Sequence, residues 1–417
     1  MSIPLRLTVM NFMQFFVWGA WLISFGAYMS KALGFSGLQI GSIYGTMGVA
    51  SLFMPGVMGI VADRWLNAER LYGILHLTGA ALILWASTVH DYPTLYWIML
   101  FNAMVYMPTI ALNNTISFRV LEQQGLNFIE KFPPIRVWGT IGFILAMWAT
   151  DLSGSVLTVG QLWISAGAAA FLGLYAFTLP ACPPARGAGK RTVAEALGLD
   201  AFVLFRRVQM VVFFLCAMML GGALQITNAF GGDFLTDFNA SYPDSFGVRH
   251  PILLSSISQI SETLFILTIP FFLKRFGIKV VMLTAIFAWV LRFGLFAFGD
   301  PGPGLWMLVM SMIVYGMAFD FFNISGAMYV NLEANERIRA SAQGLFMVMT
   351  NGLGAFLGTM VAGAVVDHYT VDGLRDWQGI WLTFAGYALV LGLLFPFVFR
   401  YKHDPISLRQ RSPAPSA

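Results

Sequence analysis

The chain has 417 residues, of which 58% are hydrophobic and only 11% charged, and its mean hydropathy is +0.73. A water-soluble protein of this length could not cover its surface with so few charges, which excludes a large soluble domain. A hydrocarbon core of roughly 30 Å requires roughly 20 apolar residues per helix. Twelve spans with short connections would take about 35 residues each, which matches the length. The composition therefore predicts an all-α polytopic membrane protein.

The apolar segments follow one another with short polar connections. The first begins after Arg6, is longer than the apolar region of a signal peptide and lacks a small-residue cleavage site, so we expect it to be retained. Cys182 and Cys216 are not placed to form a disulfide. The twelve transmembrane helices are expected at residues 7–30, 38–62, 71–90, 94–118, 134–151, 157–180, 208–235, 251–273, 278–299, 304–331, 341–366 and 378–399.

The basic residues predict the orientation of these spans. With the N-terminus in the cytoplasm, 20 of the 24 Lys and Arg residues fall in cytoplasmic segments. The outer loops keep Lys31, Arg249 and Arg375, and Arg292 falls inside the ninth span. The positive-inside rule thus predicts a multi-pass protein of the cell inner membrane with both termini cytoplasmic. The pI near 9.1 reflects this topology and not an affinity for nucleic acid.

The longest polar connection, Ala181 to Arg207, divides the spans six and six. We expect an N-terminal six-helix bundle at 1–181, a cytoplasmic linker at 182–207, a C-terminal six-helix bundle at 208–400 and a cytoplasmic tail at 401–417. Residues 192–205 are expected to form a short interfacial helix. There is no Gly-rich phosphate loop ending in Lys-Ser/Thr, so ATP is not the expected energy source.

The two halves repeat each other weakly in sequence. The matched positions are Tyr106–Asn114 with Tyr315–Asn323, Ile135–Arg136 with Ile338–Arg339, and Tyr44–Pro55 with Gln259–Pro270. Three matches in register indicate a parallel duplication of six helices, as in the two halves of a major facilitator transporter.

Two carboxylates are predicted at membrane depth. Glu262 lies 12 residues from both His250 and Lys274, which is about 18 Å from each end of a helix. Asp320 lies deep in the tenth span. Ionisable groups at this depth are expensive and are functional candidates. A structural ion pair between helices is the alternative, but we expect proton binding or substrate contact.

Neutral polar and aromatic residues recur at the same depth. Gln225 with Asn228, and Gln259 with Glu262, are three residues apart and share a helix face. Two longer stripes are Arg136, Thr140 and Phe143 in the fifth span and Tyr315, Phe319 and Phe322 in the tenth. Ordinary packing explains most aromatic stripes, and Arg136 could instead reach the lipid headgroups. Amides offer paired donors and acceptors, so together these groups suit a planar ligand that bears a sugar.

Other polar residues have simpler interpretations. His76 in the third span is expected to be a hydrogen-bonded helix residue, although it could carry a proton. Asp233 and Asp237 lie near the outer surface and are expected to be solvated.

There is no His-Glu-x-x-His run and no Ser/His/Asp set at one depth, which argues against a membrane-embedded enzyme. No soluble sensory domain is present that would suggest a receptor.

Several sequence runs resemble a known family. Residues 59–64 resemble the first half of the major facilitator loop motif, although Leu66 replaces the usual glycine. More specific are the runs at 132–140, 224–228, 257–263 and 319–325. Together they resemble the bacterial nucleoside:proton symporter family of the major facilitator superfamily, over essentially the whole chain.

This resemblance implies proton-driven import of purine or pyrimidine nucleosides, such as uridine or adenosine, by alternating access. No cofactor or metal is implied, and the transporter is expected to work as a monomer in the bilayer. Protonation would involve Asp320, with Glu262 as the other candidate. The implied substrate residues are Arg136, Thr140, Phe143, Gln225, Asn228, Gln259, Glu262, Tyr315 and Phe319.

Arg136 followed by an aromatic residue seven positions later also resembles the galactoside symporters. A proton-coupled sugar (oligosaccharide) symporter, or a drug transporter of the same fold, is therefore the alternative function.

Overall fold

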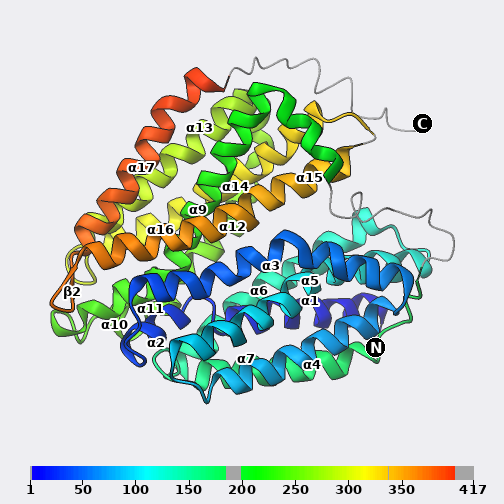
Figure 1. Cartoon of the computed structure of the whole chain (residues 1–417), viewed down its shortest axis with the longest axis horizontal. Helices are drawn as coiled ribbons and strands as arrows, with labels where there is room; N and C mark the ends of the chain where they lie inside the picture. Colours follow the sequence, from blue (N-terminus) through cyan, green and yellow to red (C-terminus); the bar gives the residue numbers. More distant parts are fainter. Residues whose placement is uncertain (1, 185–198, 337, 400–417) are drawn as a thin grey trace.

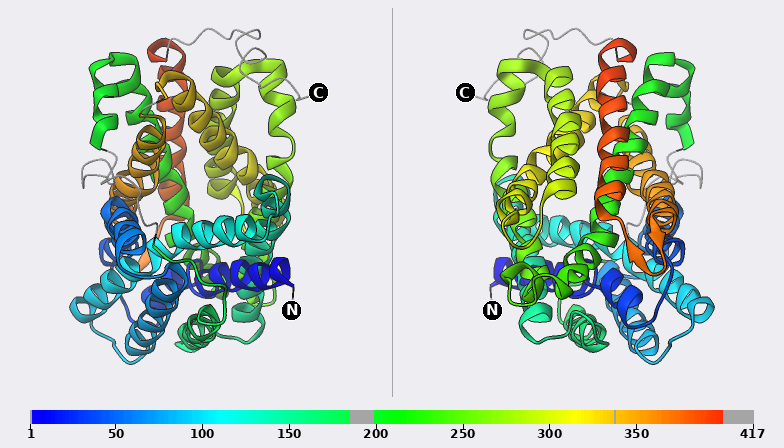
Figure 2. Two further views of the ribbon diagram at one scale, coloured as in Figure 1. Left: turned by 90° about the vertical axis from the view of Figure 1, so that its right-hand side faces the viewer. Right: turned by 90° about the vertical axis from the view of Figure 1, so that its left-hand side faces the viewer.

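The computed structural model describes residues 2–184, 199–336 and 338–399. Its helices form two bundles, one from the N-terminal half of the chain and one from the C-terminal half (Figure 1). The bundles converge at one end and diverge toward the end that carries the N-terminus. The side views in Figure 2 show the same two layers, with the blue and cyan helices below the green to red ones.

The N-terminal bundle contains the first six predicted spans. Its helices are α1 (Ile3–Gly19), α2 (Phe25–Lys31), α3 (Gly37–Arg64), α4 (Ala68–Ala86), α5 (Tyr92–Gln123), α6 (Phe128–Leu152) and α7 (Gly160–Ala176).

The C-terminal bundle contains the other six. Its elements are α9 (Val208–Asp237), η2 (Phe238–Ala240), α10 (Phe246–Arg249), α11 (Pro251–Ser255), α12 (Ile257–Ile266), α13 (Ile269–Phe298), α14 (Leu305–Glu333), α15 (Arg339–Met347), the π-helix η3 (Val348–Gly354), α16 (Ala355–His368), and α17 (Trp377–Val398). Between α16 and α17, β1 (Thr370–Val371) and β2 (Leu374–Arg375) form an antiparallel hairpin in which Thr370 pairs with Arg375.

The predicted number of spans is confirmed in the part of the chain that the structure describes. Eight helices are long and apolar enough to cross a membrane. The other four spans are α1 with α2, α4, α7, and α11 with α12. Within the predicted interfacial helix at 192–205, residues 192–198 lie outside the described residues, and Leu199–Arg206 forms the 3-10 helix η1. The predicted tail at 401–417 also lies outside them.

The first span is not the continuous helix that the sequence predicts, because it is interrupted between Gly19 and Phe25. The interruption frees backbone carbonyls, and side chains of neighbouring helices satisfy them. The Thr150 hydroxyl donates to the carbonyl of Ala20 at 2.7 Å, and the Tyr44 hydroxyl donates to that of Leu22 at 2.6 Å. A broken helix is tolerated in a membrane where protein groups replace its lost hydrogen bonds.

The eighth and ninth spans are joined without a loop. Gly277 has φ +77°, a backbone conformation that residues other than glycine rarely adopt. The chain turns at this residue within α13. The residues of α13 before Gly277 therefore complete the span that α11 and α12 begin.

At the end opposite the N-terminus, two carboxylates each cap a helix of the other bundle. Asp367 of α16 accepts hydrogen bonds from the backbone N–H groups of Gly37 (2.5 Å) and Leu38 (2.8 Å). Asp151 of α6 accepts from those of Ile252 (2.8 Å) and Leu253 (3.0 Å). The positive end of the helix dipole favours a carboxylate at both places. We call these two contacts the clasp.

The helix turns that the clasp caps follow the register of the predicted duplication. Gly37 lies seven residues before Tyr44, and Ile252 lies seven before Gln259. The two capped turns are therefore equivalent positions of the repeat that pairs Tyr44 with Gln259.

Ion pairs at the same end correct one expectation. Asp233 is fully buried and pairs with Arg375 at 2.6 Å and with Lys31 at 3.8 Å. Asp237 pairs with Lys31 and with Arg375, and accepts a hydrogen bond from the Trp377 indole at 2.6 Å. The expectation that Asp233 is solvated is wrong, because it is fully buried beside basic partners distant in sequence. Asp237 keeps part of its side chain exposed, but it is paired with the same basic residues.

Candidate substrate and proton site

The predicted site residues come from helices of both bundles. Arg136, Thr140 and Phe143 lie on α6 of the N-terminal bundle. The C-terminal bundle contributes Gln225 and Asn228 from α9, Gln259 and Glu262 from α12, and Tyr315, Phe319 and Asp320 from α14. An electrostatic interaction between Arg136 and Glu262 links the two groups across the bundles. The charges of the site thus lie where the bundles face each other.

The N-terminal wall of the site is aromatic. The Arg136 guanidinium lies 4.2 Å from the centre of the Phe15 ring. Phe143 is buried and meets the edge of Trp18, with ring centres 6.2 Å apart. The indole N–H of Trp18 is buried and has no hydrogen-bond partner among the described residues. Trp18 is absent from the predicted site, although its position beside the break in the first span makes it a candidate ligand contact.

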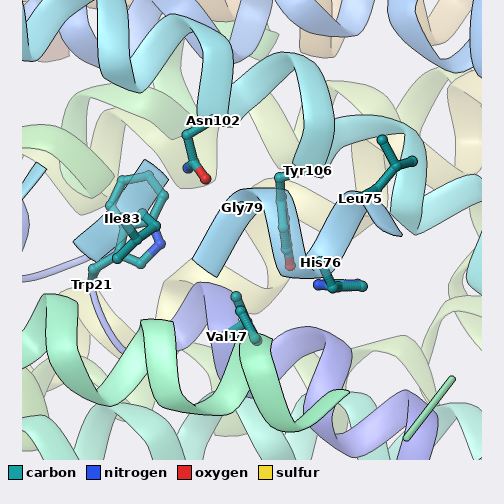
Figure 3. A pocket seen from close by; sticks show the side chains of 9 residues that line it. Val17, Trp21, Leu75, His76, Gly79, Ile83, Asn102 and Tyr106 are labelled. Atoms are coloured by element: carbon teal, nitrogen blue, oxygen red, sulfur yellow. The ribbon is translucent and has the colours of Figure 1, made fainter. Parts of the chain in front are cut away.

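Next to this aromatic wall, Gln14 accepts hydrogen bonds from Tyr106, Tyr72 and His76. The hydroxyl of Tyr106, whose ring lies 5.8 Å from that of Trp18, donates to the backbone carbonyl of Gln14 at 2.7 Å. The side-chain oxygen of Gln14 is in turn bonded by the Tyr72 hydroxyl (2.7 Å) and by His76 Nε2 (2.9 Å). Figure 3 shows His76 and Tyr106 beside a small cavity inside the bundle. The interpretation of His76 as a hydrogen-bonded helix residue is confirmed.

The amides of the C-terminal wall are available for hydrogen bonding. Asn228 donates to Gln225 at 3.3 Å, so these two side chains share a helix face as their spacing predicts. The side-chain oxygen of Gln259 is buried and has no hydrogen-bond partner in the described ranges. Because buried polar atoms are normally paired, this oxygen is a candidate ligand contact.

The aromatic stripe of α14 divides into two parts. Tyr315 and Phe319 stack with ring centres 5.9 Å apart and planes 5° from parallel. Phe322 is 2% exposed and lies against Phe213, so it belongs to the core of the bundle. The Tyr315–Phe319 stack offers aromatic faces for a flat ring, whereas Phe322 does not.

The two deep carboxylates lie on helices that approach each other closely, Glu262 on α12 and Asp320 on α14. Glu262 is half-buried, and Asp320 is 5% exposed with one carboxyl oxygen that lacks a hydrogen-bond partner in the described chain. Glu262 and Asp320 are thus the two candidates for the predicted protonation site.

A close approach of α12 to α14 sets the distance between these groups. A Cβ at Gly316 would lie 2.6 Å from the Ser261 carbonyl oxygen and 2.8 Å from the Glu262 nitrogen, so a larger residue would push the helices apart. The Ser261 hydroxyl also donates to the carbonyl of Ile313. Glu262 is thereby held against the segment that carries Tyr315, Phe319 and Asp320.

Known proteins resemble this chain over its whole length. The xanthosine permease of Escherichia coli (strain K12) is 54% identical over 415 residues, which is 99% of both chains. The nucleoside permease NupG of the same organism is 51% identical over 406 residues, which is 97% of both. The crystal structure of the nucleoside transporter NupG superimposes with a TM-score of 0.92 at 51% identity, covering 96% of this chain and 100% of that one.

More distant structures share the fold. A bacterial homologue of the human lysosomal transporter Spinster is 15% identical and matches with a TM-score of 0.69 over 96% of this chain and 98% of its own. These relatives are transporters and not enzymes. Residues 1–404 match the sequence profile described as "Nucleoside H+ symporter". The chain therefore belongs to the nucleoside H+ symporter family.

Proposed function

We propose that this protein imports nucleosides across the cell inner membrane together with protons, by alternating access of the two bundles. The observation that carries the proposal is the set of unpaired buried polar atoms at the site, namely Trp18 Nε1, Gln259 Oε1 and one Asp320 carboxyl oxygen. The stacked rings of Tyr315 and Phe319 lie on α14, the helix that also carries Asp320. Each chain contains a complete set of these groups, so we propose that the monomer transports.

The chemistry of the side chains assigns parts of a nucleoside to parts of the site. The planar base suits the aromatic faces of Tyr315 and Phe319. The amides Gln225, Asn228 and Gln259 suit the mixed donors and acceptors along the edge of a base. Glu262 can accept hydrogen bonds from ribose hydroxyls. Arg136, Thr140 and Phe143 complete the site from the other bundle.

Proton coupling is assigned to the carboxylates. Asp320 is the more buried of the two and has an unpaired oxygen. Neutralising a buried carboxylate lowers the electrostatic cost of moving it past the other bundle, and the two halves of such transporters rock against each other. We propose Asp320 as the main proton site and Glu262 as the substrate carboxylate.

The proposed orientation rests on the distribution of the basic residues. We propose that both termini are cytoplasmic, which places the clasp on the periplasmic side. Because the contacts of the clasp close that side while the bundles diverge toward the N-terminal end (Figure 1), we propose that this conformation faces the cytoplasm.

Uptake should depend on the proton gradient. In proteoliposomes, labelled uridine is expected to accumulate when an inward proton gradient is imposed, and a protonophore should abolish the accumulation. Removing sodium or ATP should have no effect. Uptake that survives the protonophore but requires sodium would contradict the proposal.

Sucrose accumulation in place of uridine would support the alternative sugar symporter. Competition by xanthosine and adenosine would define the base preference.

Substitution of the three amides should weaken binding. Gln225→Ala, Asn228→Ala and Gln259→Ala each remove one hydrogen-bonding side chain, which costs on the order of 1 kcal/mol or somewhat more and weakens affinity severalfold to about tenfold. Calorimetric titration of the purified protein with uridine measures this loss. Gln124→Ala, at an exposed amide beyond the end of α5, is the matched control. Wild-type affinity in all three variants would exclude these amides from the site.

A further inference from the structure

Arg292 is a buried cation with no ion-pairing carboxylate among the residues that the structure describes. It lies on α13, about 9 Å along the helix from Phe298, and is 4% exposed. No carboxylate lies within ion-pair distance of its guanidinium in residues 2–184, 199–336 and 338–399, and its Nε has no hydrogen-bond partner there. An intramembrane arginine without such a partner is costly and points to a functional role.

The guanidinium of Arg292 on α13 forms hydrogen bonds with two other helices, α12 and α14. Its Nη1 donates to the backbone carbonyl of Ser311 on α14 at 2.8 Å and to the hydroxyl of Ser258 on α12 at 3.5 Å. The Ser311 hydroxyl donates back to the carbonyl of Arg292 at 2.9 Å. Arg292 thus connects α12 and α14 through α13.

The same guanidinium lies against the ring of Tyr315, at 4.7 Å from its centre. Tyr315 is 4% exposed, stacks on Phe319 and meets the edge of Trp289 at 6.2 Å. A desolvated cation over an aromatic face is attracted to it by the negative face of the ring. The ring of Tyr315 is therefore fixed by Arg292 as well as by its aromatic neighbours.

The helix register connects these contacts to the ligand. Ser258 lies four residues before Glu262, and Ser311 lies four residues before Tyr315, so each anchor is one turn from a site residue on the same face. We propose that Arg292 is a positioning residue for nucleoside binding, which acts by fixing the ring of Tyr315. The inference rests on the proposed nucleoside site and extends it to a residue that does not touch the ligand.

The test is a double-mutant cycle between Arg292 and Tyr315. Arg292→Lys keeps the charge but removes the planar guanidinium that spans Ser258, Ser311 and the ring. We expect it to weaken uridine affinity about fivefold in the otherwise wild-type protein. In a Tyr315→Leu background, which binds more weakly, the same substitution should change affinity by less than about twofold, because coupled residues are not additive. Calorimetric titration with uridine is the measurement.

Controls separate positioning from general stability. Arg275→Lys, at an exposed arginine of the same helix α13, should bind uridine like wild type. Wild-type affinity in Arg292→Lys, an equal loss in both backgrounds, or a lower thermal midpoint without a change in affinity would overturn the inference. A wild-type protein that binds no nucleoside would overturn the proposed function as well, so the two failures are distinguishable.

Discussion

Asp320→Asn is expected to abolish the accumulation of uridine against a gradient while leaving equilibrium affinity within about threefold of wild type. The substitution mimics the protonated carboxyl, so the site can no longer change charge during the cycle. Exchange of internal for external uridine does not require a net proton movement and should persist.

Glu262→Gln should instead weaken binding about tenfold or more, because a hydrogen bond to a charged group contributes about 1.5–3 kcal/mol.

Both variants require two measurements on the same preparations, namely calorimetric binding and gradient-driven uptake in proteoliposomes. An Asp320→Asn protein that still concentrates uridine, together with a Glu262→Gln protein that binds normally but cannot concentrate it, would show that the roles are reversed.

Removing both clasp carboxylates should move the conformational equilibrium toward a state that is open at the clasp end. In Asp151→Ala/Asp367→Ala, four backbone N–H groups lose their carboxylate partners. Hydrogen bonds to charged groups contribute about 1.5–3 kcal/mol each, and a differential of about 5.5 kcal/mol is enough to invert a 99:1 population. The double variant should therefore populate the open state more than the wild type does, while the ion pairs of Lys31 with Asp233 and Asp237 still link the bundles at this end.

Spin labels can report this change. Thr88 and Ser241 are exposed at the clasp end of the two bundles, and the native cysteines Cys182 and Cys216 are buried. The label-to-label distance should lengthen in the double variant. Asp244→Ala is the matched control, because Asp244 is an exposed carboxylate at the same end whose pair with Arg249 is solvated. An unchanged distance distribution in the double variant would show that the clasp does not hold this end closed.

The number and order of the spans could be predicted from the sequence because hydropathy and charge act locally along the chain. The break in the first span could not, since residues 20–24 contain neither proline nor glycine. The break depends on Tyr44 and Thr150, which reach it from other helices. The burial of Asp233 was missed for the same reason, because Arg375 lies 142 residues away in sequence.

The candidate site was predictable to the extent that helical spacing determines it. The three-residue spacing of Gln225 and Asn228 correctly predicts that their side chains meet. The spacing correctly puts Phe322 one turn beyond Phe319 on α14, but spacing alone cannot show that its ring lies against Phe213 in the core of the bundle. Arg292 is conspicuous as a charge inside the ninth span, but its relation to Tyr315 depends on how α13 packs against α14.

The reciprocal caps of the clasp have a consequence for the ancestry of the fold. Asp151 of the first half caps a helix of the second, and Asp367 of the second half caps the equivalent helix turn of the first. Asp151 and Asp367 are each the last residue but one of their helices, but they lie 15 and 28 residues after the matched residues Arg136 and Arg339, so the two patches are similar and not identical. Two similar patches that each provide a carboxylate and accept one resemble an isologous interface, which is the kind that closes a two-fold homodimer. A single six-helix ancestor with this carboxylate and this helix start would have been self-complementary. Gene fusion would then have preserved a dimer contact as the contact between halves of one chain.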